Sequence, residues 1–286
     1  MTARFTLKAP AKINLSLEVL ARRADGYHEV RMLMAGLSLA DELSFESAKG
    51  LSLTCDRPEL ECGPNNLVLR AARALQTALG STAGAKIHLK KRIPLGGGLA
   101  GGSADAAATL KGLNRLWRGG MNYAELSRIA ANLGSDIPFC LKGAWAFATG
   151  RGEKIEALSL DRRLCFVLAN PGFEVSTPWV YAHLPDIRSS RRNLTRLAFE
   201  AIQRQDLAVL KKVAVNDLEP VTSGRYTEIG VLKRLLVKEG ALLSRMSGSG
   251  PTVWGLFEDT ISAKKACQVI KKMNYWVMVA HTKKGH

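Results

Sequence analysis

The stretch "PLGGGLAGGSADAAATL", Pro94 to Leu110, is the most unusual part of this 286-residue chain. Five glycines fall within seven residues, and an alanine-rich segment follows them. Glycine loses more backbone entropy on folding than any other residue, so such a cluster is costly unless the main chain must approach something closely. A bare loop that leads into a helix N-terminus presents converging amide hydrogens and positive partial charge to an anion. We therefore predict a phosphate-binding loop, with a tight turn packed on neighbouring backbone as the alternative.

Three familiar phosphate loops do not fit this stretch. A P-loop needs a lysine after its last glycine, and Ser103 stands there instead. The glycines also match the spacing of a dinucleotide fingerprint, but the next acidic residue beyond the helix, Glu125, falls in another predicted helix. The H-R-D and D-F-G tripeptides of protein kinases do not occur. The loop is therefore of another kind.

The helix that follows the loop is predicted over residues 103–117. Ser103 is expected either to cap this helix or to contact a phosphate oxygen. Asp105 lies near the predicted N-terminus, where a negative charge interacts favourably with the helix dipole. Ser103 and Asp105 are thus both expected to interact with the N-terminus of this helix.

The composition is that of an ordinary globular protein, with 47% apolar and 23% charged residues. No apolar run reaches the ~18 residues of a membrane span, and the N-terminal segment lacks a signal-peptide pattern. The five scattered cysteines form no C-x-x-C pair, which favours free thiols in a reducing cytoplasm over a zinc site or disulfides. The net charge of +16 indicates an anionic partner: nucleic acid, a membrane surface or small anionic substrates.

The segment "APAKINLSLEVL" has the period of a half-buried strand. Its apolar face carries Ile13, Leu15, Leu17 and Val19, and its polar face carries Lys12, Asn14, Ser16 and Glu18. Further strand and helix patterns follow without strict alternation, and they restart after about residue 155. We predict an α+β fold with two lobes, residues 1–155 and residues 156–286.

Four motifs in this order resemble the GHMP kinases, a superfamily of small-molecule kinases. They are "PAKINLSL", "PLGGGLAGGSADAA", "GSDIPF" and "MSGSGPT". The central loop is similar to the nucleotide motif of that family, with Ala100 in place of one glycine and Ala104 in place of the second serine. The resemblance spans nearly the whole chain. It implies the two-lobed GHMP fold, with ATP in the N-terminal lobe.

The resemblance also implies which residues bind ATP. These are Pro94, Leu95, Gly96, Gly97, Gly98, Leu99, Ala100, Gly101, Gly102, Ser103 and Ala104. Mg²⁺ is expected to arrive with ATP, with water and phosphate oxygens as most of its ligands, and we name no protein residue as a ligand. The second glycine loop, "SGSGPT", would lie near the phosphates on the substrate side, although by pattern alone it is a turn between strands.

Two residues are implied to be catalytic. By pattern alone, Lys12 is a solvated strand lysine and Asp136 caps a short helix that contains Pro138. The resemblance implies instead that Asp136 is the general base for the substrate hydroxyl, and that Lys12 orients it and stabilises the developing charge.

The pairing of "AKINL" with "DGYH" resembles the GHMP kinases that phosphorylate a CDP-linked methylerythritol on its 2-hydroxyl. It implies that Tyr27 stacks on the cytosine, that His28 hydrogen-bonds the edge of the base, and that Asn14 contacts the methylerythritol. By pattern alone, Tyr27 and His28 are hairpin residues.

Other readings stay open from the sequence. A mevalonate- or homoserine-kinase-like enzyme would keep the glycine loop, and a basic nucleic-acid-binding protein would explain the charge. We expect small-molecule substrates, no nucleic acid and no membrane association, a cytoplasmic location, and a monomer or weak homodimer.

Overall fold

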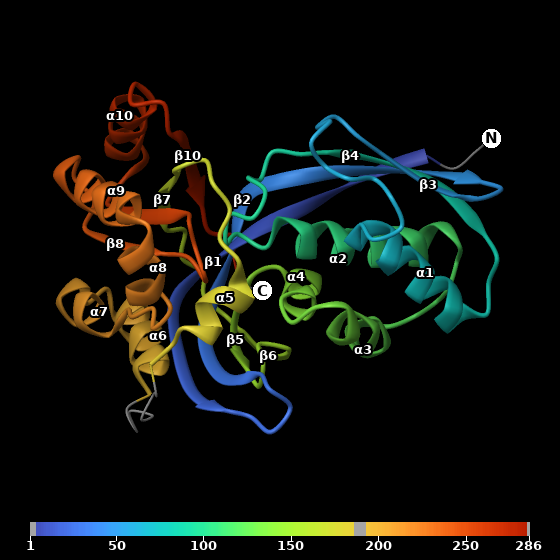
Figure 1. Cartoon of the computed structure of the whole chain (residues 1–286), viewed down its shortest axis with the longest axis horizontal. Coiled ribbons are helices and arrows are strands. Elements are labelled where there is room, and N and C mark those ends of the chain that lie inside the picture. The colour runs from blue at the N-terminus through green and yellow to red at the C-terminus, as the bar shows by residue number, and fades with distance from the viewer. Residues whose placement is uncertain (1–3, 186–192, 285–286) are drawn as a thin grey trace. The chain divides into compact units, whose positions relative to one another are not determined.

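The computed structural model describes residues 4–185 and 193–284 and confirms the α+β fold (Figure 1). The chain divides into two compact units built from alternating segments. The first unit is Met1–Ala11, Leu39–Pro94 and Ala100–Gly143, and the second is Lys12–Ser38, Leu95–Leu99 and Ala144–His286. The segments alternate because the two longest strands, β1 (Arg4–Arg22) and β2 (His28–Ala48), contribute to both units. The domain boundary near residue 155 stays a prediction.

The first unit combines a sheet with four helices. Its sheet contains the later part of β2, which pairs antiparallel with β4 (Gly84–Lys90), and β3 (Leu51–Cys55), which pairs parallel with β4. The helices are α1 (Leu67–Leu79), α2 (Gly101–Leu116), α3 (Tyr123–Leu133) and α4 (Ile137–Lys142). α1 and α2 lie side by side, and α3 and α4 pack against α2 (Figure 1).

Local sequence signals explain where these helices begin and end. Asn66 accepts a hydrogen bond from the Val68 N–H at the start of α1, and Gly80 ends α1 in the left-handed conformation. Asn122 and Glu125 form a capping box at the start of α3. Small residues bring α2 close to the sheet, since a Cβ on Gly112 would lie 2.6 Å from the ring of Phe45.

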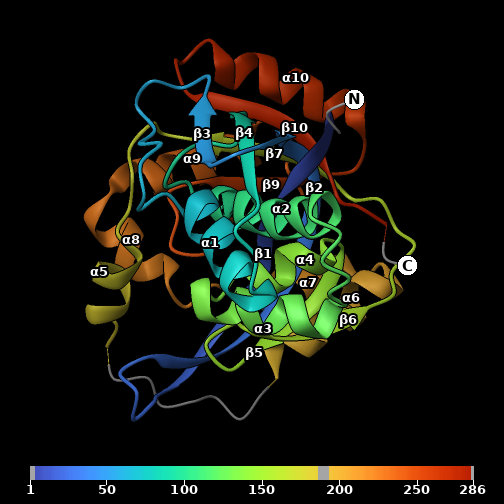
Figure 2. The same cartoon turned by 90° about the vertical axis from the view of Figure 1, so that its right-hand side faces the viewer.

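The second unit is built around a four-stranded antiparallel sheet in the order β10-β7-β9-β8. Its strands are β7 (Cys165–Asn170), β8 (Leu243–Met246), β9 (Val253–Phe257) and β10 (Trp276–His281). α9 (Thr227–Lys238) packs on β8 and β9, and α10 (Thr260–Lys271) packs on β7 and β10 (Figure 2).

The remaining elements of the second unit are two strands beside the early part of β2 and four short helices. β5 (Trp145–Thr149) pairs with β2, and β6 (Lys154–Leu158) pairs with β5. The other helices are α5 (Thr177–Ala182), α6 (Leu194–Arg204), α7 (Leu207–Val213) and α8 (Glu219–Arg225). Gln205 ends α6 in the left-handed conformation, and α7 begins at Leu207.

The expectation of a half-buried strand at residues 12–19 is wrong, because both faces of β1 are covered there. Lys12, Asn14, Ser16 and Glu18 are all buried. Glu18 accepts hydrogen bonds from the main-chain N–H groups of Leu194 and Thr195 at the start of α6. The covering residues come from late in the chain, which a local alternation pattern cannot reveal.

Candidate active site

The two glycine loops of the sequence contact each other inside the second unit. Ser247 Oγ donates a 3.0 Å hydrogen bond to the carbonyl oxygen of Gly98, and the Thr252 N–H donates to the Gly97 carbonyl at 3.3 Å. Gly98 has φ +72°, and a Cβ there would lie 2.4 Å from the Ser247 carbonyl oxygen. Close packing of the main chain therefore requires glycine at position 98. For this one residue, the alternative of a tight turn packed on neighbouring backbone is confirmed.

The open part of the glycine stretch lies at the start of α2, in the first unit. α2 begins at Gly101, two residues earlier than predicted. Its N-cap is Ala100 in the left-handed conformation, with no side-chain capping hydrogen bond, so the predicted capping by Ser103 is wrong. A Cβ on Gly102 would meet nothing within 4 Å. The first turn of a 16-residue helix thus has open space beside it, as an anion site at a helix N-terminus requires.

Lys12 and Asn14 lie together on one face of β1. The Lys12 ammonium donates a 2.6 Å hydrogen bond to Asn14 Oδ1, and both side chains are buried. The Asn14 N–H donates to Ser247 Oγ, and a Cβ on Gly248 would lie 3.6 Å from Lys12 Nζ. Two predicted site residues from the N-terminal strand therefore adjoin the "SGSGPT" loop in the second unit.

Tyr27 and His28 follow the turn between β1 and β2 in the second unit. Tyr27 is 53% exposed, and the Arg151 guanidinium carbon lies 4.8 Å from its ring centroid. The His28 ring lies 5.2 Å from the ring of Tyr181, which comes from α5. Burial and the charge of Arg22 lower the pKa of His28, which favours the neutral imidazole. Sequence reasoning missed Tyr181 because nothing local links it to the hairpin.

Asp136 lies in the first unit, at the N-cap position of α4. The helix carries proline in its first turn, as predicted, but the Asp136 side chain accepts no capping hydrogen bond. The short helix packs against α2. The alternative in which the Asp136 side chain caps α4 is therefore wrong.

A buried ionic cluster in the first unit was not anticipated. The Lys91 ammonium donates to Asp41 Oδ2 and, at 2.8 Å, to Asp105 Oδ2. The sequence suggests a helix-dipole interaction for Asp105 and does not reveal that its carboxyl is buried against Lys91. Burial, and to a lesser degree the charge of Asp41, raise the pKa of Asp105 to about 7 against the opposing charge of Lys91.

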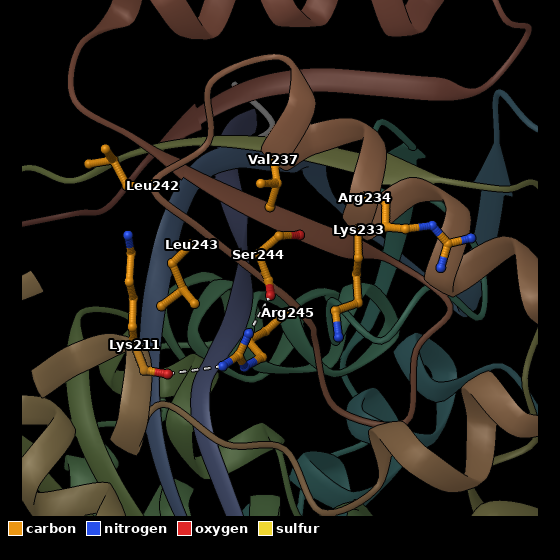
Figure 3. A pocket seen from close by; sticks show the side chains of 8 residues that line it. All are labelled: Lys211, Lys233, Arg234, Val237, Leu242, Leu243, Ser244 and Arg245. Atoms are coloured by element: carbon orange, nitrogen blue, oxygen red, sulfur yellow. Dashed lines mark hydrogen bonds between the residues drawn. The ribbon is translucent and has the colours of Figure 1, made fainter. Parts of the chain in front are cut away.

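Metal ligands and other cavities add little to the candidate site. Within residues 4–185 and 193–284, no three histidine, cysteine or acidic side chains come together to hold a metal ion. A pocket of about 480 Å³ in the second unit contains none of the predicted site residues (Figure 3). In it, Arg245 donates hydrogen bonds to the carbonyl oxygens of Lys211, Ala214 and Ser244, so the guanidinium ties β8 to the end of α7.

Among the described residues, every helix is too short or too polar to span a bilayer.

The family models of the GHMP kinases match both halves of the chain. The GHMP kinase N-terminal domain matches residues 66–144, and the GHMP kinase C-terminal domain matches residues 198–275. Among solved structures, a 4-(cytidine 5'-diphospho)-2C-methyl-D-erythritol kinase is 34% identical with a TM-score of 0.85, covering 98% of this chain and 100% of that one. A homoserine kinase from Cytophaga hutchinsonii is 21% identical with a TM-score of 0.75, covering 99% and 95%, and shares the fold.

Curated relatives are similar over nearly their full length. The 4-diphosphocytidyl-2-C-methyl-D-erythritol kinase of Caldanaerobacter subterraneus subsp. tengcongensis is 41% identical, with 98% of this chain and 97% of the relative covered. The kinase of the same name from Synechococcus sp. (strain JA-2-3B'a(2-13)) is 45% identical, with 95% and 92% covered. The chain therefore belongs to the GHMP kinases and, within them, to the 4-diphosphocytidyl-2-C-methyl-D-erythritol kinase family.

Proposed function

We propose that this protein transfers the γ-phosphoryl group of ATP to the 2-hydroxyl of 4-diphosphocytidyl-2-C-methyl-D-erythritol. The observation that carries this proposal is the full-length similarity to kinases of that name, combined with the group formed by Tyr27, His28 and Tyr181. A mevalonate or homoserine kinase has no cytosine to bind, so this group would lack a purpose in such an enzyme.

We propose that the cytosine is held by the aromatic group at the hairpin. The exposed ring of Tyr27 offers a face on which a base can stack, and Tyr181 places a second aromatic ring beside His28. A neutral imidazole has one donor and one acceptor nitrogen, so His28 can hydrogen-bond the edge of the base. Stacking accepts any base, whereas the hydrogen bonds select cytosine.

We propose that the glycine stretch Pro94–Ala104 holds the phosphates of ATP. The open side of α2 at Gly102 and the small residues of its first turn support close approach of an anion to main-chain N–H groups. Mg²⁺ would enter with ATP, coordinated largely by phosphate oxygens and water, because Mg²⁺ gives up its water reluctantly.

We propose that Asp136 and Lys12 carry the chemistry. Asp136 accepts the proton of the 2-hydroxyl while the hydroxyl oxygen forms a bond to the γ-phosphorus of ATP. The bond between the γ-phosphorus and the oxygen that bridges it to the β-phosphate breaks, and ADP leaves. Lys12 supplies a fixed positive charge near the developing alkoxide, and its 2.6 Å hydrogen bond to Asn14 holds the ammonium in place. Asn14, next to Lys12 on the same face of β1, is proposed to contact the methylerythritol.

The proposal is tested by incubating the protein with Mg-ATP and the cytidylated methylerythritol and locating the new phosphate by phosphorus NMR. We expect a monoester on the 2-oxygen, and we expect no turnover of mevalonate or homoserine. Phosphorylation of either of those instead would refute the proposal. We further propose that the enzyme works in the cytoplasm, where ATP is supplied. The prediction of a monomer or weak homodimer awaits measurement.

A further inference from the structure

The buried cluster of the first unit places one cation between two carboxyl groups. Side-chain exposure is 3% for Lys91, 0% for Asp41 and 4% for Asp105. If all three groups were ionised, the cluster would carry an unbalanced negative charge away from water. Burying such a charge is costly, so the cluster has a strong tendency to bind one proton.

The hydrogen bonds identify which carboxyl group takes the proton. Asp41 Oδ1 accepts from the main-chain N–H groups of Arg92 and Ile93, and its Oδ2 accepts from Lys91, so both Asp41 oxygens are already engaged as acceptors. Asp105 Oδ2 accepts from Lys91, whereas Asp105 Oδ1 is buried and has no hydrogen-bond partner among the described residues. The carboxyl oxygen without a partner is where a proton costs no existing hydrogen bond.

The charged groups that contact the cluster come from β2 and from the segments that follow β3 and β4. Asp41 belongs to β2, and Lys91 follows β4. The next carboxylate, Asp56 after β3, accepts a hydrogen bond from the Lys91 main-chain N–H, and that bond lowers the pKa of Asp56. Asp56 therefore stays ionised while Asp105 titrates, with a pKa raised to about 7 chiefly by burial.

The cluster lies directly behind the first turn of α2. A Cβ on Gly101 would be 3.2 Å from Lys91 Nζ and 3.0 Å from the side chain of Ile93. Asp105 itself lies one turn further along the same helix. A change in the charge of this cluster therefore acts on the first turn of α2, where the leading main-chain N–H groups of a helix have no intrahelical partner.

We infer that Asp105 is a positioning residue whose proton sets the charge behind the nucleotide phosphates and thereby the affinity for ATP. With the proton bound, the cluster is neutral and the phosphates meet only the N–H groups and the helix dipole. Without it, a negative charge lies behind these groups and repels ATP. The inference rests on the proposed function, because it takes the start of α2 to be the phosphate site.

The direct test is carbon-13 NMR of the aspartate carboxyl groups in the wild-type protein, with the Asp105 signal assigned by its loss in Asp105→Asn. We expect this carbon to titrate near neutral pH, and a midpoint below about pH 5 would overturn the inference. This measurement needs no bound nucleotide.

The functional test is calorimetric measurement of the ATP dissociation constant from about pH 6 to about pH 8.5, which brackets the midpoint. We expect wild-type affinity to fall roughly fivefold more over this range than the affinity of Asp105→Asn, whose amide carries no charge at any pH. Protonation of ATP itself cancels in that comparison. Asp56→Asn is the matched control: it removes a nearby carboxylate that stays ionised, so its pH curve should keep the wild-type shape.

The outcomes separate this inference from the proposed function. Parallel curves for the wild type and Asp105→Asn would overturn the inference while leaving the kinase intact. A protein that binds no ATP at any pH would overturn the proposed function, and the NMR titration would still decide whether Asp105 holds a proton. A kinetic readout follows as well: the KM for ATP should track the dissociation constant while kcat changes little.

Discussion

Asp136 occupies a helix N-cap position without forming the side-chain cap that its position suggests. An aspartate at the start of a helix ordinarily accepts a main-chain hydrogen bond, and that bond keeps the carboxylate tied to the backbone. The proposed role as general base requires instead that the carboxylate accept a proton from the substrate hydroxyl. The short helix α4, with proline in its first turn, fixes the position of the Asp136 main chain.

Replacing Asp136 by Asn tests its proposed role as the base. We expect kcat to fall by roughly 10²–10⁴-fold, because the amide cannot accept the proton of the hydroxyl. Folding and ATP affinity should stay near wild type, because Asn has almost the same size and shape as Asp and the carboxylate is proposed to act on the substrate hydroxyl. Steady-state kinetics with calorimetric ATP binding as the control distinguish the two effects, and wild-type turnover would remove Asp136 from the mechanism.

Replacing His28 by Ala tests recognition of the base. We expect the KM for the cytidylated substrate to rise roughly tenfold, which corresponds to the loss of one hydrogen bond to the substrate. The KM for ATP should not change. His88→Ala is a matched control, because His88 is an exposed histidine of the first unit that bonds Thr54. Equal changes in the two KM values would argue against a role in reading cytosine.

At the scale of elements, the glycine stretch serves two different purposes. Its first part, up to Leu99, lies in the second unit and packs on the "SGSGPT" loop, while its second part opens α2 in the first unit. The two purposes predict opposite behaviour when an alanine is introduced.

Gly98→Ala should destabilise the fold. The residue has φ +72°, and its Cβ would lie 2.4 Å and 2.8 Å from the carbonyl oxygens of Ser247 and Gly250. Left-handed strain together with displacement of the second loop should lower the free energy of unfolding by at least about 2 kcal/mol. Denaturant unfolding measures this loss, and an unchanged midpoint would show that the two loops do not pack as described.

Gly102→Ala should behave in the opposite way. Nothing lies within 4 Å of its Cβ position, and alanine favours the helix by up to about 1 kcal/mol over glycine. Stability should therefore be kept or slightly raised. ATP affinity should fall, because the new methyl group enters the space proposed for the phosphates. Unaltered ATP binding in calorimetry would place the phosphates elsewhere.

At the scale of the whole molecule, Asp105 couples stability to pH. Its pKa is raised from 3.8 to about 7 in the folded state, so the folded protein holds this proton more tightly than the unfolded chain. The stability that this provides is fully present below about pH 4 and is lost as the pH rises toward 7. Asp105→Asn removes this dependence.

The measurement is the free energy of unfolding by urea at a series of pH values for both proteins. The difference between Asp105→Asn and the wild type should change in favour of the variant by roughly 2–4 kcal/mol between pH 4 and pH 8, since each unit of pKa shift corresponds to about 1.4 kcal/mol. Other titrating groups cancel in the difference. A difference that does not vary with pH would mean that Asp105 is ionised throughout.

The sequence by itself determined the features that depend on near neighbours. The caps of α1 at Asn66 and Gly80, the break at Gln205 and the alternation of Ile13 to Val19 are written within a few residues of one another. Helix caps and strand periodicity are local interactions, so a local pattern reveals them. The order of the glycine and "AKINL" motifs was likewise enough to indicate the family.

Only the tertiary structure decided the features that depend on distant partners. The burial of Lys12 and Asn14, the contact of His28 with Tyr181 and the sharing of Lys91 between two carboxyl groups all join residues from separate elements. Ser247 reaches Gly98 across 149 positions of sequence. A buried polar group is satisfied by whatever the fold brings next to it, and pairing of this kind leaves no periodic or short-range pattern in the chain.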